Sequence, residues 1–319
     1  MFSYCCSLYL YLSTIYHPNR TKYSQINQAV TIKQHLAPNL PLDRPSLHPI
    51  NQPRGTMAGS RGTLFLFATL GVLSILSLPE ATHGWSSGGA TWYGSPSGHG
   101  SEGGACGYKN DVGQFPFSSM IAAGGESLFK KGKGCGACYR IKCKENPACS
   151  GNHVTVVLTD SCPDATCQKE KAHFDMSGTA FGAMAKPGKA DQLRNAGILT
   201  VEYDRVPCKY QGKKVSFKMD AGANPFYLAL LVEYEQGDGD LTSVEVMEAG
   251  GTKGNVKWEP MRQSWGALWC MDSKTGKPLQ APFSFRITSG KGKVLVANNV
   301  VPAGWNAGKC YTSHVNYPA

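Results

Sequence analysis

Apolar and polar residues alternate at period two in several short segments of the chain. Two of these segments, residues 138–143 and 154–158, read CYRIKC and VTVVL. The same alternation returns near the C-terminus, in residues 215–219, 228–232 and 244–246. Alternation at period two predicts strands with one buried face, and glycine-rich turns such as residues 237–240 separate them. The pattern therefore predicts a mainly β protein.

Two short helices are predicted between the strands. Ser177 can cap the first helix, and Phe181 and Met184 lie three residues apart on one face of it. The Pro-Gly pair at 187–188 ends this helix. A second helical turn covers residues 191–196 and stops at the glycine that follows.

A continuous apolar run lies upstream of the predicted strands, at residues 64–78. It follows Arg61 and precedes small and polar residues, so residues 57–84 have the pattern of a secretory signal peptide. The run is shorter than the ~20 residues that a membrane span needs. We interpret residues 1–56 as an upstream segment that is disordered or assigned to the protein in error, with Met57 as the true start.

Cysteine usage agrees with secretion, because twelve cysteines are unusual in the reducing cytosol. Eight of them lie in the first part of the predicted mature chain: Cys106, Cys135, Cys138, Cys143, Cys149, Cys162, Cys167 and Cys208. An even number after a signal peptide predicts a disulfide framework. The spacing of Cys135 and Cys138 also occurs in redox sites and in half of a zinc site, but no βαβ pattern and no completing histidine accompany it.

The composition changes after Cys208, and this change marks a domain boundary. Residues 85–208 are rich in cysteine and glycine and form the first predicted domain. A polar stretch at residues 209–214 is the predicted linker. Residues 215–319 contain only two cysteines and several short strands, which predicts a β-sandwich.

The net charge of the predicted mature chain limits the classes of partner that it can be expected to bind. Residues 85–319 carry 26 Lys and Arg against 20 Asp and Glu, a net charge of +6. A mildly basic protein is attracted to acidic polymers such as pectin or glucuronic-acid-bearing xylan, although the same charge also serves solubility alone. The lysines are dispersed, so nucleic acid is not expected. We expect no cofactor, no metal ion and no stable protein partner, and no Asn-x-Ser/Thr sequon follows residue 84.

Five motifs of residues 85–319 follow one another in a specific order and spacing. They are TWYG at 91–94, GGACGY at 103–108, KCKENPACSG at 142–151, HFD at 173–175 and WGALW at 265–269. In this order and spacing they resemble the motifs of β-expansins, plant cell-wall proteins similar to grass-pollen group-1 allergens. Each motif alone is common, but five in register are highly specific.

This resemblance implies a double-psi β-barrel of the family-45 glycoside-hydrolase type, followed by an immunoglobulin-like β-sandwich that binds carbohydrate. It also implies disulfides, and the implied pairs are Cys106–Cys135, Cys138–Cys208 and Cys143–Cys149. Cys162 and Cys167 are candidates for a fourth bridge. Cys270 and Cys310 either bridge within the second domain or stay unpaired.

The related hydrolases invert the anomeric carbon, which requires an acid and a separate carboxylate base ~6.5–9.5 Å apart. The resemblance implies that Asp175 matches the acid. The base of the hydrolases follows the first-strand aromatic, where this chain has Gly94 and Ser95 after Tyr93. Asp160 is the other carboxylate of the implied groove. Four roles are open for it: to act as the base, to bind sugar, to shift the pKa of Asp175, or to hold a turn through hydrogen bonds from backbone amides.

Three further side chains belong to the implied groove. Thr91 and Tyr93 supply hydroxyl groups that can bond a glycan or the acid. His173 adjoins Asp175, which could equally cap the helix that follows. Burial of Asp175 would raise its pKa, so we expect activity to rise at acidic pH.

Aromatic rings can bind the C–H faces of sugars with a large buried apolar area. The resemblance assigns this role to three rings across both domains, namely Trp92, Tyr227 and Trp265. Three other tryptophans are assigned to the core of the protein, namely Trp258, Trp269 and Trp305.

The resemblance implies a secreted, monomeric protein that binds wall polysaccharide and loosens the plant cell wall without cutting its polymers. The sequence leaves open whether the natural ligand is arabinoxylan, cellulose or mixed-linkage glucan. One alternative is an inverting endoglucanase or xylanase that uses Asp175 and Asp160. Another is a recognition protein that keeps the fold and has lost the loosening activity.

Overall fold

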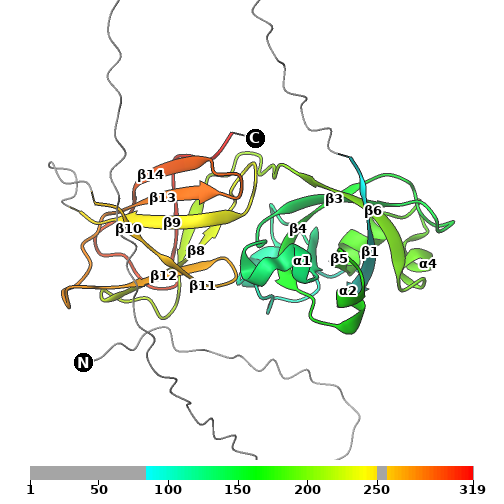
Figure 1. Ribbon diagram of the computed structural model, residues 1–319, viewed down its shortest axis with the longest axis horizontal. Coiled ribbons are helices and arrows are strands. Elements are labelled where there is room, and N and C mark those ends of the chain that lie inside the picture. Colours follow the sequence, from blue (N-terminus) through cyan, green and yellow to red (C-terminus); the bar gives the residue numbers. More distant parts are fainter. Residues whose placement is uncertain (1–83, 250–256, 319) are drawn as a thin grey trace, which may run out of the picture. The chain divides into compact units, whose positions relative to one another are not determined.

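The computed structural model describes residues 84–249 and 257–318 (Figure 1). The predicted upstream segment 1–56 and all but the last residue of the predicted signal peptide 57–84 lie outside these described residues. Among the described residues, no helix has the length and apolar character needed to cross a membrane.

The first domain is a closed barrel of six strands in the order β1-β5-β2-β4-β3-β6. These strands are β1 (Ser86–Tyr93), β2 (Ile121–Gly124), β3 (Cys138–Cys143), β4 (Val154–Ser161), β5 (His173–Ser177) and β6 (Leu199–Val206). Two pairs are parallel, β1 with β5 and β2 with β4, and the other pairs are antiparallel. This fold requires a closed sheet of parallel and antiparallel strands in which neighbouring strands are not consecutive in the sequence. The predicted double-psi β-barrel is therefore confirmed.

Short helices connect the barrel strands. They are η1 (Lys109–Gly113), α1 (Glu126–Phe129), η2 (Lys130–Gly132), α2 (Ala165–Lys169), α3 (Gly178–Gly182) and α4 (Ala190–Arg194). The predicted cap is present, since the Ala180 amide donates to the Ser177 hydroxyl at 3.0 Å. Helix α3 ends at Gly182, earlier than the predicted stop at 187–188. The guanidinium of Arg194 donates to the Gly178 carbonyl and joins α4 to α3.

The second domain consists of two antiparallel sheets packed face to face (Figure 1). Its strands are β7 (Ser216–Met219), β8 (Tyr227–Glu233), β9 (Leu241–Met247), β10 (Glu259–Pro260), β11 (Arg262–Trp265), β12 (Leu268–Asp272), β13 (Phe283–Ser289), β14 (Val294–Val301) and β15 (Cys310–Thr312). One sheet has the order β10-β9-β13-β14 and the other β11-β12-β8-β7-β15. The alternating residues of the sequence pattern, such as Phe217, Leu230 and Val244, are fully buried between the sheets. The predicted β-sandwich is confirmed.

Barrel and sandwich share a buried apolar cluster, which we call the junction. Its residues are Cys106, Tyr108, Val112, Phe117, Ile121, Cys135, Cys138, Val157, Cys208, Tyr210, Leu231 and Leu268. Tyr210 lies in the stretch predicted as a linker, and its burial means that this stretch packs against both domains. We keep 209–214 as the proposed linker, because it lies between the last barrel strand and the first sandwich strand.

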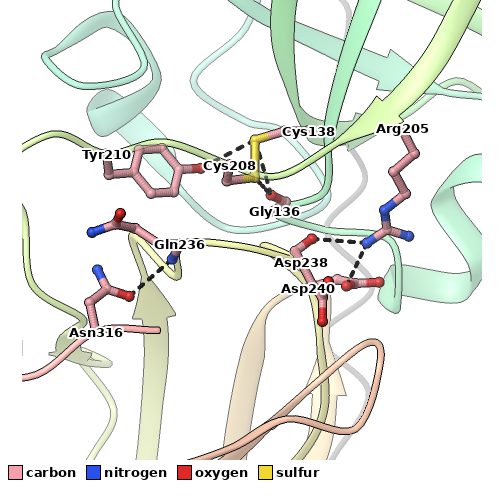
Figure 2. Close-up of a disulfide and its surroundings, with 9 residues drawn as sticks. All are labelled: Gly136, Cys138, Arg205, Cys208, Tyr210, Gln236, Asp238, Asp240 and Asn316. Carbon is pink, nitrogen blue, oxygen red and sulfur yellow. Dashed lines mark hydrogen bonds and ion pairs between the residues drawn. A yellow bond between two sulfur atoms is a disulfide. The ribbon is translucent and has the colours of Figure 1, made fainter. Parts of the chain in front are cut away.

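Polar contacts border the junction on one side (Figure 2). The Arg205 guanidinium of β6 donates to the Asp238 carbonyl at 2.9 Å and lies 2.6 Å from a carboxylate oxygen of Asp240. The backbones of Cys208 and Gly237 exchange two hydrogen bonds beside this ion pair. The turn predicted at residues 237–240 therefore joins the sandwich to the barrel.

Glycines bring the two backbones together at the junction. Gly266 has φ +52°, and a Cβ on it would overlap the Ala105 carbonyl oxygen. A Cβ on Gly132 would lie 2.8 Å from the Gly266 nitrogen. Since real Cβ atoms do not approach so closely, these positions require glycine. The same holds for Gly136 and Gly239, which cross one another.

The described residues contain four disulfides. Three are the pairs that the resemblance implied, Cys106–Cys135, Cys138–Cys208 and Cys143–Cys149, and the fourth is the candidate pair Cys162–Cys167. Cys270 is buried on β12 and Cys310 is exposed on β15. Strands β8 and β7 lie between β12 and β15, which separates the two backbones by roughly 14 Å. This separation is too large for a bridge between Cys270 and Cys310.

Candidate functional site

Two carboxylates flank one alanine in the barrel sheet. Ala123 on β2 pairs with Asp175 on β5 and, on its other side, with Asp160 on β4. Residues directly paired across strands project to the same face, and the two aspartate backbones are two strand spacings apart, about 10 Å. We call the two aspartates, with Thr91 and Tyr93, the carboxylate site.

Asp175 is held by the neighbouring strand. Thr91 is its register partner on β1, and the Thr91 hydroxyl donates to Asp175 Oδ1 at 2.7 Å. Burial raises the pKa of Asp175, while the Thr91 hydrogen bond and the charge of His173 oppose this rise. The carboxyl group therefore takes up a proton more readily than an exposed aspartate.

His173 lies behind Thr91 and is fully buried, with an exposed fraction of 0%. Its Nε2 is 2.9 Å from the Thr91 hydroxyl oxygen, and its Nδ1 is 3.0 Å from Glu170 Oε2. Glu170 was not predicted from the sequence. Its place three residues before His173 is the only local signal, and that spacing is common in proteins.

Asp160 is fastened by backbone amides. The amides of Ala105 and Ser161 both donate to Asp160 Oδ1, at 2.6 Å and 2.7 Å. Burial raises the pKa of Asp160, and these two hydrogen bonds oppose the rise. Of the roles left open from the sequence, the tying of a turn is therefore present in the structure. The second oxygen, Oδ2, takes no part in these bonds.

Tyr93 lies close to both carboxylates. Burial raises the pKa of its phenol, and the charges of Asp160 and Asp175 raise it further. The phenol is therefore neutral and can donate a hydrogen bond. Its ring lies against Gly100, where a Cβ would overlap the ring.

The position after Tyr93 is built for glycine. Gly94 has φ +77°, a region that residues with a side chain rarely adopt. A Cβ at this position would lie 2.8 Å from the Gly100 backbone. A carboxylate could not be placed there without moving both segments.

Trp92 lies on the other face of β1 from Thr91 and Tyr93. It pairs with Met176 and packs against the barrel core, and its indole N–H donates to the Arg194 carbonyl at 3.0 Å. The structure therefore does not bring Trp92 together with the carboxylate site, although its ring is only partly buried.

Tyr227 and Trp265 project from one face of the five-stranded sheet. Tyr227 pairs with Asp272 and Trp265 pairs with Leu268, on the side of β12 that faces away from the sandwich core. Trp265 is 46% exposed. From the strand spacings, the two backbones are roughly 16 Å apart. These rings can contact separate sugars of one long glycan.

The loop at residues 104–107 connects Trp265 with the carboxylate site. The Ala105 amide binds Asp160, while a Cβ on Gly107 would lie 3.0 Å from the Trp265 ring. The Ala267 amide also donates to the Cys106 carbonyl at 3.0 Å. The loop therefore contacts the exposed ring and the carboxylate on the two sides of the junction.

The other three tryptophans differ in burial. Trp269 is buried in the sandwich core as predicted, but Trp258 and Trp305 are only half-buried. The Arg286 guanidinium lies 4.9 Å from the Trp258 ring centroid, so this ring pairs with a cation at the surface.

Trp305 lines an open cavity of about 440 Å³ at one end of the sandwich. Amide side chains of Asn224, Gln280 and Asn306 share its wall, together with small apolar residues. None of the lining residues is ionisable, so this cavity has no group for acid–base chemistry.

Within residues 84–249 and 257–318, no cluster of three or more His, Cys, Asp or Glu side chains is suited to hold a metal ion. Fold and site together define a two-domain protein in which a glycoside-hydrolase-type barrel with two half-buried carboxylates is joined to a sandwich that carries aromatic rings on its outer face.

Comparisons with known proteins agree with this class. Residues 215–302 match the family model of the expansin C-terminal domain, and residues 121–203 match a family described as lytic transglycolase. The chain is 63% identical over 236 residues to expansin-B11 of Oryza sativa subsp. japonica, covering 74% of this chain and 79% of that protein. It is 54% identical over 234 residues to putative expansin-B2 of Arabidopsis thaliana, covering 73% and 83%. The chain therefore belongs to the β-expansin family.

A solved structure shares the fold. The crystal structure of an expansin from Clavibacter michiganensis superposes with a TM-score of 0.53 at 21% identity, covering 74% of this chain and 99% of that chain. A mutant of that bacterial protein in complex with cellohexaose gives the same values.

Proposed function

We propose that this protein is a secreted, monomeric wall-loosening protein. It binds wall polysaccharides of the matrix xylan or cellulose type and displaces them from their neighbours without cutting them. The free energy comes from binding alone, so a polymer held by the protein loses its weak contacts with the next polymer. Membership of the β-expansin family supports this proposal.

The observation that carries the non-hydrolytic function is the glycine after Tyr93. An inverting hydrolase needs a base that activates water, and the related hydrolases carry it at this position. Here Tyr93 is followed by Gly94, which has a positive φ and no room for a side chain, and then by Ser95, so neither residue is a carboxylate. Asp160 is a weak substitute, because two amides hold one of its oxygens.

The polysaccharide-binding residues proposed on the sandwich are Tyr227 and Trp265. A flat exposed ring binds the C–H face of a sugar with little loss of side-chain entropy. In the barrel, Asp160, Asp175, Thr91 and Tyr93 provide hydrogen bonds to sugar hydroxyl groups. Trp92 remains a proposed contact through the exposed part of its ring.

One paired experiment tests the proposal. Purified mature protein is added to heat-inactivated plant cell walls under load, and to soluble xylan and swollen cellulose. Wall extension and new reducing ends are measured side by side. We expect extension without new reducing ends. Reducing ends that accumulate in proportion to extension would contradict the proposal.

A second candidate function is inverting hydrolysis of glucan or xylan by Asp175 and Asp160. The placement of both carboxylates beside Ala123 favours it. Under this function Asp175 protonates the leaving oxygen and Asp160 Oδ2 activates water. Asp160→Asn would then abolish release of reducing ends, whereas a binding protein would release none in either form.

Secretion through the predicted signal peptide 57–84 is part of the proposal. Mass spectrometry of the N-terminus of the protein from culture medium or cell wall tests it. We expect the chain to begin near Trp85. Any peptide from residues 20–50 in the secreted material would contradict the interpretation of Met57 as the start.

A further inference from the structure

A chain of four side chains runs from the protein surface to Asp175. Glu170 contacts His173, His173 contacts Thr91, and Thr91 contacts Asp175, with heavy-atom distances of 3.0, 2.9 and 2.7 Å. The His173 ring is fully buried, while the Glu170 side chain is 38% exposed. The outer end of the chain therefore meets solvent, and the inner end is the proton-binding group of the site.

The number of protons that this chain holds follows from its geometry. With Thr91 donating to Asp175, the Thr91 oxygen must accept a proton from His173 Nε2. The facing Glu170 oxygen accepts hydrogen bonds only, so His173 Nδ1 must also carry a proton. In this arrangement the ring carries both protons, and Glu170 and Asp175 are both carboxylates. The net charge of the chain is −1.

A second arrangement contains the same number of protons. Asp175 is protonated and donates to the Thr91 oxygen, Thr91 donates to His173 Nε2, and His173 Nδ1–H still donates to Glu170. The net charge is again −1. One arrangement becomes the other when a proton passes from Asp175 to the Thr91 oxygen while the Thr91 proton passes to Nε2. No water or other reactant is consumed.

The backbone leaves room for Glu170 in this position. Glu170 directly follows α2, which the Cys162–Cys167 disulfide ties to the end of β4. Gly89 is the register partner of His173 on β1, and a Cβ on Gly89 would overlap the Glu170 carboxylate. The carboxylate can reach the ring because β1 carries no side chain at this point.

We propose that Glu170 is a positioning residue of the carboxylate site, which acts through His173 and Thr91 to set how readily Asp175 holds a proton. This inference rests on the proposed function, in which Asp175 contacts the polysaccharide. The other charged or titratable groups near Asp175 are Asp160 and Tyr93 from β4 and β1, and Asp164 beside α2. All of them are neutral or negative, so none of them supplies a positive charge beside Asp175.

The pH dependence of glycan binding tests the role of Glu170. Binding of the mature protein to swollen cellulose and arabinoxylan is measured from pH 3.5 to 8 for wild type and Glu170→Gln. The amide keeps an acceptor for Nδ1–H but removes a negative charge, which makes loss of the titrating proton easier. We expect the midpoint of the profile to fall by about one pH unit. Glu145→Gln, an equal change in an exposed loop, is the control and keeps the wild-type midpoint.

Two further variants interrupt the chain at other points. Gly89→Ala displaces the Glu170 carboxylate and should lower the midpoint as Glu170→Gln does. Thr91→Val removes the link, so Glu170→Gln added to it should change the midpoint no further. Thr91→Ser restores the hydroxyl and should restore the wild-type profile. A midpoint for Glu170→Gln that equals the Glu145→Gln value overturns the proposal.

Nitrogen-15 NMR of the His173 ring gives a readout that does not need glycan binding. We expect the chemical shifts of both ring nitrogens and of the Asp175 carboxyl carbon to change over the same pH range. Glu170→Gln should move that range for the ring and for the carboxyl group alike. His99, His153 and His314 serve as internal references, whose signals should be the same in wild type and in Glu170→Gln. If wild type binds no glycan at any pH, the proposed function fails, yet coupled signals still support the chain. Signals of His173 and Asp175 that are identical in wild type and Glu170→Gln overturn the inference.

Discussion

Lys218 on the first strand of the sandwich pairs with Asp111 in the 3-10 turn of the barrel, with Nζ 2.5 Å from Oδ2. Glu233 lies beside this pair with only 1% of its surface exposed. Burial, followed by the charge of Asp111, raises the pKa of Glu233 to about 8. Burial also raises the pKa of the nearby Glu235 to about 8. Two buried carboxyl groups of the sandwich are therefore protonated in acid and must ionise in alkali.

The stability of the protein should consequently fall as pH rises. In the unfolded chain both glutamates lose their protons near the ordinary value of 4.5, whereas in the folded protein they keep them up to about 8. Between these values the folded state binds more protons, so each group lowers the free energy of unfolding by at most about 1.4 kcal/mol per pH unit. Urea unfolding at pH 5, 6, 7 and 8 measures this slope.

Glu233→Gln tests the assignment of this slope. Between pH 5 and 8, the free energy of unfolding of the variant should decrease by about half as much as that of wild type, because one of the two titrating groups is gone. Glu145→Gln, in an exposed loop, should keep the wild-type slope. If the free energy of unfolding of Glu233→Gln depends on pH as steeply as that of wild type, Glu233 does not cause the loss of stability.

Asp175→Asn should weaken the response of wall extension to acid. The raised pKa of Asp175 means that the wild-type site gains a proton at a higher pH than an exposed aspartate does, and the amide cannot. We expect a flatter extension profile between pH 4 and 7, measured by creep of isolated walls. An unchanged profile in the variant, or a wild-type profile that is already flat, would show that Asp175 does not carry the pH dependence.

Trp265→Ala and Tyr227→Ala should each weaken binding to cellulose about tenfold, which corresponds to about 1.4 kcal/mol of binding free energy. The loss arises because an apolar ring face is no longer buried against sugar. Depletion from solution by cellulose particles measures the affinity. Phe115→Ala, which removes an exposed ring from the barrel, is the control and should have no effect. Equal losses in all three variants would argue against a specific platform.

The Cys138–Cys208 disulfide should stabilise the protein more than the Cys143–Cys149 disulfide. Their sequence separations are 70 and 6 residues, so the first restricts the unfolded chain far more. The chain-entropy model gives about 4 kcal/mol for the first and about 2 kcal/mol for the second. Replacing each pair by alanines and measuring urea unfolding tests this order. A larger loss from the short loop would contradict it.

Much of the fold could be predicted from local patterns. The alternation at residues 138–143 coincides with β3, and the strand pattern of the C-terminal part is present in both sheets. Ser177 caps α3 because its hydroxyl needs only an amide three residues away. Such contacts depend on neighbours in sequence and can therefore be predicted from sequence.

The resemblance to β-expansins singled out Thr91, Asp160, His173 and Asp175, and the structure brings these residues together through strand register. Register depends on how β1, β2, β4 and β5 meet, and no local pattern contains that information. Glu170 was missed for this reason, since its contact with His173 depends on Gly89 of another strand.

The burial of Glu233 was also not predictable from its strand. Glu233 occupies an outward position on β8, where alternation predicts exposure to water. The barrel covers this part of the sheet, as the buried contacts of Leu231 and Leu268 show. Packing between domains thus reverses the environment that the strand pattern alone implies.

The glycine crossings at the junction also affect how the protein acts on a polymer. Gly132 against Gly266 and Gly136 against Gly239 leave no side chain between the two backbones that could yield under load. Under the proposed function, a glycan that occupies the carboxylate site and the ring of Trp265 together meets two surfaces whose backbones touch directly. We expect the polysaccharide, rather than the junction, to take up the distortion when the two surfaces do not match its straight form.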